Sequence, residues 1–582
     1  MNPKTGGFMN QDRFHSLPAG AVRLHGVMGK ALRLTTDNRL KKVDYRKLVD
    51  PFRFRNEKDN LWRCEFWGKI VRSAILAWHG TQDAELLQII RDTVRDMLST
   101  QTPDGCISSY PAEKQTGGWD IWGRKYVLLA LLRYYNLIEH DEQVLNACRG
   151  MLDHLMQQIP VTGQSMPHYG WQTGLAASSI LGAVCGVAAA SGEQRYRDYA
   201  RWLIDSGCAL KHNIFEAARR HVPPAETGNG KAYEMLSCFQ GLSEFYLMDP
   251  QEEYLESVME FFRMVKEQEI FITGGGGLKD TVGEFWYYGT MRQTRDDSGN
   301  HGETCVTATW LHYCDRILKL TGSATAADCM ERSFYNAMLG SMKPDGSWYI
   351  HANPSPLSGA GFKKAAPDQL PGFGEDCCLA QGPEGIAMAS YTAVLGSHDG
   401  IVLNAYEPLT CSFNTPRGQT AELEVSGNYP WRETVGITLC IQEPERFTIR
   451  FRIPCWWKGR SVFRLNGKEL SAVPGEYLAL ERSWSNADRV EILFDLTPEQ
   501  VFSPDISRVG YLAGPVVLAQ DSRLGEVNRP VPADGITQDT ENPGNEFHLV
   551  KRLSDGTLLC DYASAGNRFS MDNRLTVWMK RK

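Results

Sequence analysis

The chain has 582 residues, enough for one very large domain or several ordinary ones. Hydrophobic residues make up 42% and charged residues 23%, values typical of a soluble globular protein rather than a disordered or fibrous one. The formal net charge is −7, and no dense cluster of Lys and Arg is present, which argues against a nucleic-acid partner.

The cysteine usage and the first residues indicate the cellular compartment. The cysteines number 15, an odd count without the dense spacing of a disulfide scaffold, so we expect most of them to be reduced. The first 20 residues lack the apolar stretch of a signal peptide, and no run of about 18 apolar residues suggests a membrane span. We therefore expect a cytoplasmic protein with no membrane partner.

Residues 58–396 carry apolar side chains at helical spacing, in segments separated by short turns that contain Gly, Pro or Asp. The segments expected to be helices are 61–78, 84–98, 121–137, 142–158, 175–190, 232–247, 253–265, 306–320 and 386–395. Paired helices in this number suggest hairpins arranged in a ring. Residues 1–57 form a separate N-terminal segment, which we expect to pack on the β-rich part of the chain.

Residues 397–582 show short β-rich runs separated by turn residues. These runs are IVLNAY, AELEVSG, VGITLCI, RFTIRFRI, SVFRLNG, EYLALE, RVEILFDL and GYLAGPVVLA. Their spacing is typical of a β-sandwich. The expected fold class is therefore mainly α with a C-terminal β domain.

Two short motifs, GETC and EDCC, carry side chains suited to a metal ion. They offer Glu303, Cys305, Cys377 and Cys378, and zinc takes four such ligands. Glu303 and Cys305 are two positions apart, so on a regular helix they would point to roughly opposite sides, and we expect them to precede the helix. The alternative is that Cys377 and Cys378 are an adjacent buried pair or a vicinal disulfide, with Glu303 as a helix cap.

The segments around these motifs resemble glycoside hydrolase family 127, the zinc-dependent β-L-arabinofuranosidase family. The resembling segments of the helical half are FITGGGGLKDTVGEFWYY, GETCVTATWLHYCDRILKLTG, ERSFYNAMLGSMKPDGSWYIHANPSPL and EDCCLAQGPEG. NYPW, FRIPCWW, LNG and YLAGPVVLAQ in the β-rich half resemble the same family. The resemblance extends from about residue 50 to residue 520.

The resemblance implies an (α/α)6 barrel followed by β-sandwich material, and it suggests a homodimer. It also implies Zn2+ held by Glu303, Cys305, Cys377 and Cys378, with Cys377 as the nucleophile of a retaining mechanism. Glu284, in a Gly-Glu-aromatic sequence before ETC, matches the general acid/base. Such chemistry is physically reasonable because zinc keeps a thiol ionised near neutral pH, so no histidine base is needed.

The chain departs from the family's pattern near the sugar. LAQGP follows the paired cysteines where better-known members have Pro-Pro-Asn, and DIWGRKY and GNGKAYE stand where those members place pocket histidines. The expected sugar-binding residues are Trp122, Arg124, Lys125, Lys231 and Tyr233, with His351 and Asn353 from a pocket-lining strand.

Three of these residues, Arg124, Lys125 and Lys231, would make the pocket cationic if they face inward. A cationic pocket favours an acidic sugar, because Arg binds carboxylates with two hydrogen bonds and Lys supplies a point charge. The alternative is that these cations lie on the outside of the barrel.

The leading hypothesis is a zinc-dependent retaining exo-glycosidase whose substrate is an oligosaccharide or glycoside bearing β-L-arabinofuranose or a related, acidic sugar. Two alternatives stay open. One is a carbohydrate-binding protein with a structural zinc, because four protein ligands complete a tetrahedron. The other is a two-carboxylate hydrolase or an isomerase on the same helical barrel, which fold analogy alone does not separate from the first.

Overall fold

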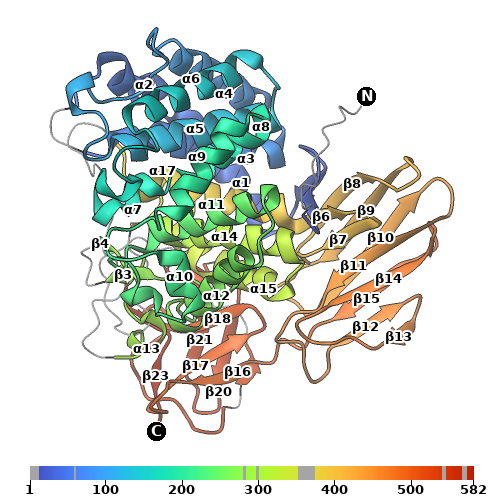
Figure 1. Cartoon of the computed structure of the whole chain (residues 1–582). Coiled ribbons are helices and arrows are strands. Elements are labelled where there is room, and N and C mark those ends of the chain that lie inside the picture. The colour runs from blue at the N-terminus through green and yellow to red at the C-terminus, as the bar shows by residue number, and fades with distance from the viewer. Residues whose placement is uncertain are drawn as a thin grey trace. The chain divides into compact units, whose positions relative to one another are not determined.

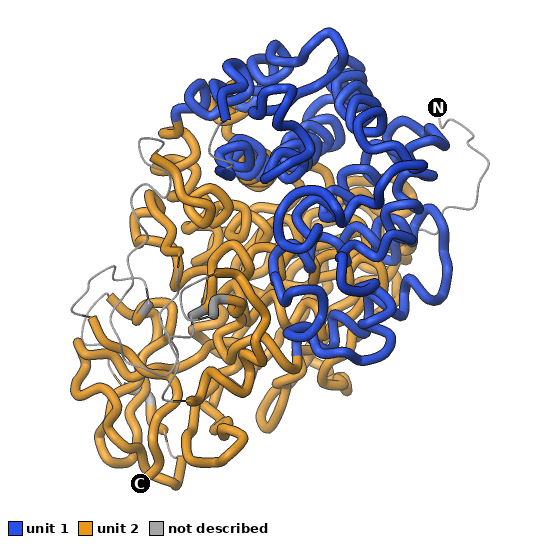
Figure 2. Tube along the Cα trace, turned by 60° about the vertical axis from the view of Figure 1, so that its left-hand side comes forward, with its two compact units in different colours: residues 1–13, 44–72, 90–266 blue, residues 14–43, 73–89, 267–582 orange. Residues whose placement is uncertain are grey.

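The computed structural model describes residues 12–57, 61–279, 283–295, 301–351, 374–535, 537–540, 546–566 and 573–582. The chain divides into two compact units, shown in different colours in Figure 2. The first unit comprises Met1–Arg13, Asp44–Arg72 and Ile90–Lys266, and the second comprises Phe14–Val43, Ser73–Ile89 and Glu267–Lys582.

Helices dominate the chain up to Ala393 (Figure 1). The α-helices of this region are α1 (Val27–Asn38), α2 (Tyr45–Phe54), α3 (Phe66–Thr81), α4 (Ala84–Leu98), α5 (Asp120–Leu137), α6 (Glu142–Gln158), α7 (Leu175–Ser178), α8 (Leu181–Ser191), α9 (Gln194–Asp205), α10 (Ile214–Arg219), α11 (Ala232–Met248), α12 (Glu252–Gln268), α13 (Gly289–Arg292), α14 (Thr304–Thr321), α15 (Ala324–Ser333), α16 (Leu339–Ser341) and α17 (Cys377–Ala393). Every helix expected from the apolar spacing overlaps one of these.

The apolar spacing works because one face of each helix is buried. In α4, Leu86, Ile90, Val94 and Met97 recur every three or four residues, and all are at most 2% exposed. The stretch Gln172–Ser191 is apolar and long enough to span a membrane by composition, but 72% of its most apolar window is buried inside the protein. Its apolar residues therefore belong mostly to the core.

Two sheets follow the helices. The first has the strand order β1-β6-β7-β11-β14 and the second the order β13-β12-β15-β10-β9-β8-β2. The strands are β1 (His15–Ser16), β2 (Val22–Leu24), β6 (Val394–Ser397), β7 (Gly400–Leu403), β8 (Leu409–Asn414), β9 (Thr420–Gly427), β10 (Thr434–Ile441), β11 (Glu445–Arg452), β12 (Val462–Leu465), β13 (Lys468–Leu470), β14 (Tyr477–Trp484) and β15 (Arg489–Leu493). The N-terminal strands β1 and β2 pair with β6 and β8, so the start of the chain adds one strand to each sheet.

A third sheet closes the chain. It contains β16 (Glu499–Phe502), β17 (Arg508–Ala513), β18 (Val516–Asp521), β19 (Thr537–Asp539), β20 (Val550–Leu553), β21 (Leu558–Asp561), β22 (Leu575–Thr576) and β23 (Met579–Lys580), with the short helix α18 (Tyr562–Gly566). Its strands have their own apolar cores, one of which includes Val509, Tyr511 and Leu559. The domain boundaries expected at residues 57 and 396 stay predictions.

Helix α17 begins earlier than its sequence suggests. The expected helix starts at residue 386, after Gly382 and Pro383, yet α17 begins at Cys377 and runs through Pro383. Proline has no N–H to donate to the carbonyl four residues before it, here that of Leu379. The Arg39 Nε donates to the Leu379 carbonyl at 3.4 Å instead, and Arg39 also pairs with Glu375. A side chain from α1's C-terminal end thus supplies the hydrogen bond that proline cannot.

Candidate metal and catalytic site

The candidate metal ligands lie where α14 and α17 begin. Glu303 is the N-cap of α14 and has an extended backbone, as expected, whereas Cys305 lies inside the first turn of that helix. Cys377 and Cys378 are the first two residues of α17. The two helices pack against each other, so their N-terminal ends bring the two motifs together across more than 70 residues of sequence.

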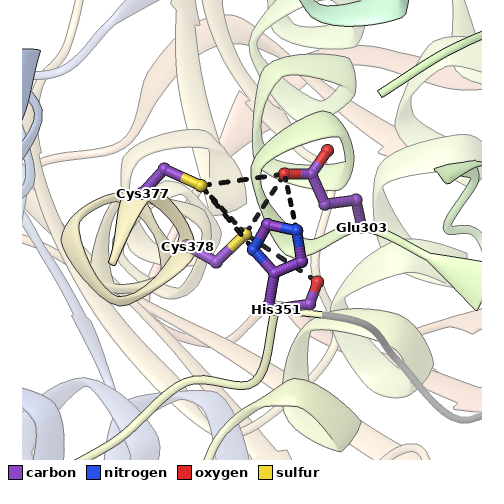
Figure 3. Close-up of side chains that lie close together, drawn as sticks. All are labelled: Glu303, His351, Cys377 and Cys378. Atoms are coloured by element: carbon purple, nitrogen blue, oxygen red, sulfur yellow. Dashed lines mark hydrogen bonds and ion pairs between the residues drawn. The ribbon is translucent and has the colours of Figure 1, made fainter. Parts of the chain in front are cut away.

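A carboxylate, two thiols and an imidazole converge at this place (Figure 3). Donor atoms of Glu303, His351, Cys377 and Cys378 all lie within 4.8 Å of one another. Glu303 Oε1 is 3.4 Å from Cys378 Sγ and 3.9 Å from Cys377 Sγ, and the two sulfurs are 3.9 Å apart. The two cysteines therefore do not form a vicinal disulfide.

Cys305 lies next to this group. Its side chain hydrogen-bonds to the thiols of Cys377 and Cys378, and it is fully buried. Hydrogen bonds from Cys305 and Cys378, together with the nearby His351, hold the pKa of Cys377 well below its ordinary value. Burial raises the pKa of Cys378 well above its ordinary value, and the hydrogen bonds with Cys305 and Cys377 act in the same direction.

His351 is the residue whose role in this group the sequence did not anticipate. Its Nδ1 is 3.7 Å from Cys377 Sγ and 3.5 Å from Asp376 Oδ2, and its Nε2 is 3.9 Å from Glu303 Oε1. Burial disfavours the charged imidazole, but the Cys377 thiolate and Asp376 raise the pKa of His351 well above its ordinary value. His351 therefore contacts the cysteines directly, rather than serving only as a pocket-lining residue.

A small sheet brings the acid/base candidate to the same site. β3 (Gly277–Lys279) pairs with β4 (Gly283–Glu284) on one edge and with β5 (His301–Gly302) on the other. Glu284 is the last residue of β4, and Glu303 directly follows β5. Their side chains share a hydrogen bond, and burial and the Glu284 charge raise the pKa of Glu303 well above its ordinary value.

The residues present fit a zinc ion. Thiolates, a carboxylate and an imidazole are the donors that zinc takes in proteins, and the group is buried at the ends of two helices. A cation bound there would also remove the cost of burying a carboxylate beside a thiolate. The four sequence-predicted ligands Glu303, Cys305, Cys377 and Cys378 are thus brought together, with His351 as a fifth candidate donor.

The expected sugar-binding residues from α5 and α11 lie in the first unit. Arg124 is buried, and its guanidinium pairs with Asp120 at 2.8 Å and bonds to Gln158 at 2.9 Å. Its charge is therefore matched within its own helix. Lys125 is also buried, and its amine lies 3.6 Å from the Trp122 ring centre and donates to Ser179 Oγ at 3.1 Å.

Burial changes the charge that Lys125 can carry. Burial lowers the pKa of Lys125 well below its ordinary value, although the charge of Glu234 acts in the opposite direction. Lys231 is the N-cap of α11 and is 7% exposed, and the Tyr233 hydroxyl hydrogen-bonds to that of Tyr126. The expectation that these residues bind sugar stays a prediction.

Three further residues bear on the site: one that the sequence predicted and two that it did not. Asn353 lies outside the described residues. Asp376 accepts from the backbone N–H groups of Cys378 and Leu379, at 2.8 and 3.2 Å, and so caps the helix that carries the cysteines. An Asp directly before a helix is a recognisable capping signal, whereas nothing in the sequence marked Glu269, which is described below.

Comparison with known proteins identifies the family. The profile described as "Beta-L-arabinofuranosidase, GH127 catalytic domain" matches residues 24–391, and that of the GH127 middle domain matches residues 400–496. A curated relative, the non-reducing end beta-L-arabinofuranosidase of Bifidobacterium longum subsp. longum, is 22% identical over 538 residues, covering 84% of this chain and 77% of its own.

Solved structures of the same family share the fold. A GH127 beta-arabinofuranosidase has a TM-score of 0.79 at 17% identity, covering 98% of each chain. The GH127 beta-L-arabinofuranosidase from Geobacillus stearothermophilus T6 has a TM-score of 0.75 at 17% identity, covering 96% of this chain and 100% of its own. The expected (α/α)6 barrel followed by β-sandwich material is thereby confirmed. This chain belongs to the GH127 β-L-arabinofuranosidase family and is a glycoside hydrolase.

Proposed function

We propose that this protein is a zinc-dependent retaining exo-glycosidase that acts on β-L-arabinofuranosides or a related sugar. The observation that carries the proposal is the cluster of Glu303, His351, Cys377 and Cys378, with Cys305 hydrogen-bonded to the two thiols and Glu284 hydrogen-bonded to Glu303. The relative from Bifidobacterium, which is named for release of non-reducing-end β-L-arabinofuranose, supports the choice of sugar.

Cys377 is the proposed nucleophile. Glu303, Cys305, Cys378 and Cys377 would hold Zn2+, which when bound supplies the positive charge that keeps the thiol ionised at neutral pH. The Cys377 sulfur attacks the anomeric carbon, and the bond from that carbon to the leaving oxygen breaks. The product of this step is a thioglycosyl enzyme.

Glu284 is the proposed general acid/base. It gives its proton to the leaving oxygen in the first step, which releases the aglycone as an alcohol. In the second step the Glu284 carboxylate takes a proton from water, the water oxygen attacks the anomeric carbon, and the Cys377 thiolate departs. Two displacements at one carbon retain its configuration, as in retaining enzymes that use two carboxylates.

The proposal includes a preference for a sugar that carries a carboxylate. Lys125 is buried beside Trp122 and Tyr233 in the first unit, and Lys231 is buried in the same unit. Because burial disfavours the charge on Lys125, the Lys231 amine is the proposed partner of a sugar carboxylate. The Asp120 partner of Arg124 offsets one of the three cations on which this idea depends.

The decisive experiment combines metal analysis with a screen of nitrophenyl glycosides, including β-L-arabinofuranosides and uronic-acid glycosides. We expect about one zinc per chain and turnover of a β-linked furanoside or a related acidic sugar. Cys377→Ala should lower kcat by at least about 1000-fold, because no other group forms the covalent bond. A clear preference for the neutral arabinofuranoside would contradict the acidic-sugar part alone.

The same variants test the remaining alternative for the mechanism. A two-carboxylate hydrolase predicts that Cys377→Ala retains turnover. Full activity of Cys377→Ala with an intact fold would therefore refute the proposed nucleophile.

A further inference from the structure

Glu269 is a buried carboxylate that the proposed chemistry does not use. It directly follows α12 and is 0% exposed. Its two oxygens accept three backbone hydrogen bonds, from the N–H groups of Tyr287 at 2.9 Å, Tyr288 at 3.1 Å and Gly289 at 3.0 Å. A carboxylate can accept all three at once because it has no hydrogen to donate when ionised.

These three N–H groups belong to the loop that leaves Glu284. Only Phe285 and Trp286 separate Glu284 from the first of them. The backbone of Glu284 itself is held by pairing with Leu278 of β3. The chain on both sides of the acid/base is therefore held by backbone hydrogen bonds, and Glu269 provides those on the C-terminal side.

The loop has a conformation that needs such support. Tyr288 has φ 64°, in the left-handed region that residues other than glycine rarely occupy. Gly289 lies so close to the Glu269 carbonyl oxygen that an added Cβ would be 2.5 Å from it. The Thr290 hydroxyl also donates to the Ile270 carbonyl at 3.0 Å. The loop thus packs directly on residues 269–271.

We propose that Glu269 is a positioning residue for the general acid/base: by holding the N–H groups of residues 287–289 it fixes the Glu284 carboxyl at the distance from the leaving oxygen that proton transfer requires. This inference rests on the proposed function, in which Glu284 protonates the leaving oxygen. Burial raises the pKa of Glu269 to about 7, and the three N–H groups act in the opposite direction.

A displaced acid has a specific kinetic signature. Departure of an alkyl alcohol needs a proton in the transition state, whereas 2,4-dinitrophenolate leaves without one. A misplaced Glu284 therefore slows hydrolysis of an alkyl glycoside much more than that of an activated aryl glycoside. A general loss of folding or of zinc slows both substrates equally, so the ratio of the two kcat/KM values isolates positioning.

The test uses Glu269→Gln in the zinc-loaded enzyme, with methyl and 2,4-dinitrophenyl glycosides of the sugar selected by the screen. Glutamine has the same size, but its NH2 group opposes at least one of the backbone N–H donors. We expect kcat/KM to fall about 10- to 100-fold for the methyl glycoside and less than about threefold for the activated one. Equal losses on both substrates would overturn the proposal.

Glu407→Gln is the matched control. Glu407 is also a buried glutamate, 1% exposed, and it accepts from the backbone N–H groups of Met28 and Gly29, both at 3.2 Å. Burial raises its pKa to about 7 as well, but it holds α1 rather than the loop after Glu284. We expect Glu407→Gln to leave the ratio of the two kcat/KM values within about twofold of the wild-type ratio. A change like that of Glu269→Gln would overturn the proposal.

Two further variants keep the result interpretable. Glu284→Gln should show the same substrate selectivity more strongly, and if it shows none, the proposed role of Glu284 fails together with this inference. If Glu284→Gln is selective and Glu269→Gln is not, only this inference fails. Thr290→Val removes a weaker contact of the same loop and serves as the test if Glu269→Gln does not fold. A loss of kcat/KM of about threefold for the methyl glycoside alone would then support the proposal. Equal kcat/KM changes for both substrates would overturn it.

Discussion

Asp376 shows how one side chain sets the position of two cysteines. Its Oδ1 accepts from the N–H groups of Cys378 and Leu379, and its Oδ2 lies 3.5 Å from His351 Nδ1. The cap and the histidine contact therefore come from the same carboxylate. A loss of the cap would loosen the first turn of α17, in which both cysteines lie.

We predict that Asp376→Ala lowers the free energy of unfolding by about 1 kcal/mol through loss of the cap, and that it weakens zinc binding. Asp376→Asn keeps an oxygen that accepts from the same N–H groups, so it should retain most of the stability. Chemical denaturation and zinc competition with a chelator would measure the two effects. Equal stability of the Ala and Asn variants would count against the cap.

At the scale of single residues, the sequence predicted which cysteine and glutamate side chains come together better than it predicted the residues around them. Glu303, Cys305, Cys377 and Cys378 could be chosen because thiolates and carboxylates are unusual together and their motifs are family-specific. His351 could not be assigned to the thiols, because its position depends on how the turn after Tyr349 meets α17. Glu269 could not be predicted either, because a glutamate after a helix is common in any sequence and its partners are visible only in the structure.

Secondary-structure elements were predicted well where one face is buried. In β9 and β10 the exposure alternates residue by residue, so the strands are visible in the sequence. The start of α17 was not visible, because Gly382 and Pro383 are typical of a turn and the compensating hydrogen bond comes from Arg39, more than 300 residues earlier. Short-range patterns cannot reveal such a partner.

A buried ion cluster connects α15 with β11. Arg452 is 1% exposed and pairs with Asp328 and, at 2.6 Å, with Glu331 of α15. Its Nε also donates to the Asn404 carbonyl at 2.8 Å. Because both carboxylates lie in the interior, the guanidinium is the charge that makes their burial tolerable.

We expect Arg452→Leu to lower the free energy of unfolding by about 3–5 kcal/mol, because it leaves buried carboxylates without a cation. Arg446 on the same strand provides the control, since it pairs with Glu481 at 2.9 Å but its side chain is 69% exposed. Arg446→Leu should change stability by less than about 1 kcal/mol. Urea denaturation of both variants would decide, and equal effects would refute the role of burial.

Stability of the whole molecule should respond to pH through Glu407. Burial raises its pKa to about 7, above the value of about 4.5 expected when unfolded, so the folded protein binds this proton more tightly. The contribution of protonated Glu407 to the free energy of unfolding is therefore fully present below about pH 4.5, and it is lost as the pH rises through 7.

Glu407→Gln removes this titration. We expect the free energy of unfolding of the variant, relative to that of the wild type, to rise by roughly 3 kcal/mol from about pH 4.5 to pH 8, because only the wild type must then bury a charge. The difference between the two free energies of unfolding, measured at several pH values, isolates this group from all others. A difference independent of pH would mean that the Glu407 pKa is ordinary.

The order β4-β3-β5 has a consequence for motion around the reacting sugar. Glu284 ends one outer strand and Glu303 follows the other, so the strands that lead to both residues pair through their backbones with a single central strand, Gly277–Lys279. When thermal fluctuation shifts that strand, both carboxylates shift with it. The separation of Glu284 and Glu303 should consequently vary less than the position of either residue.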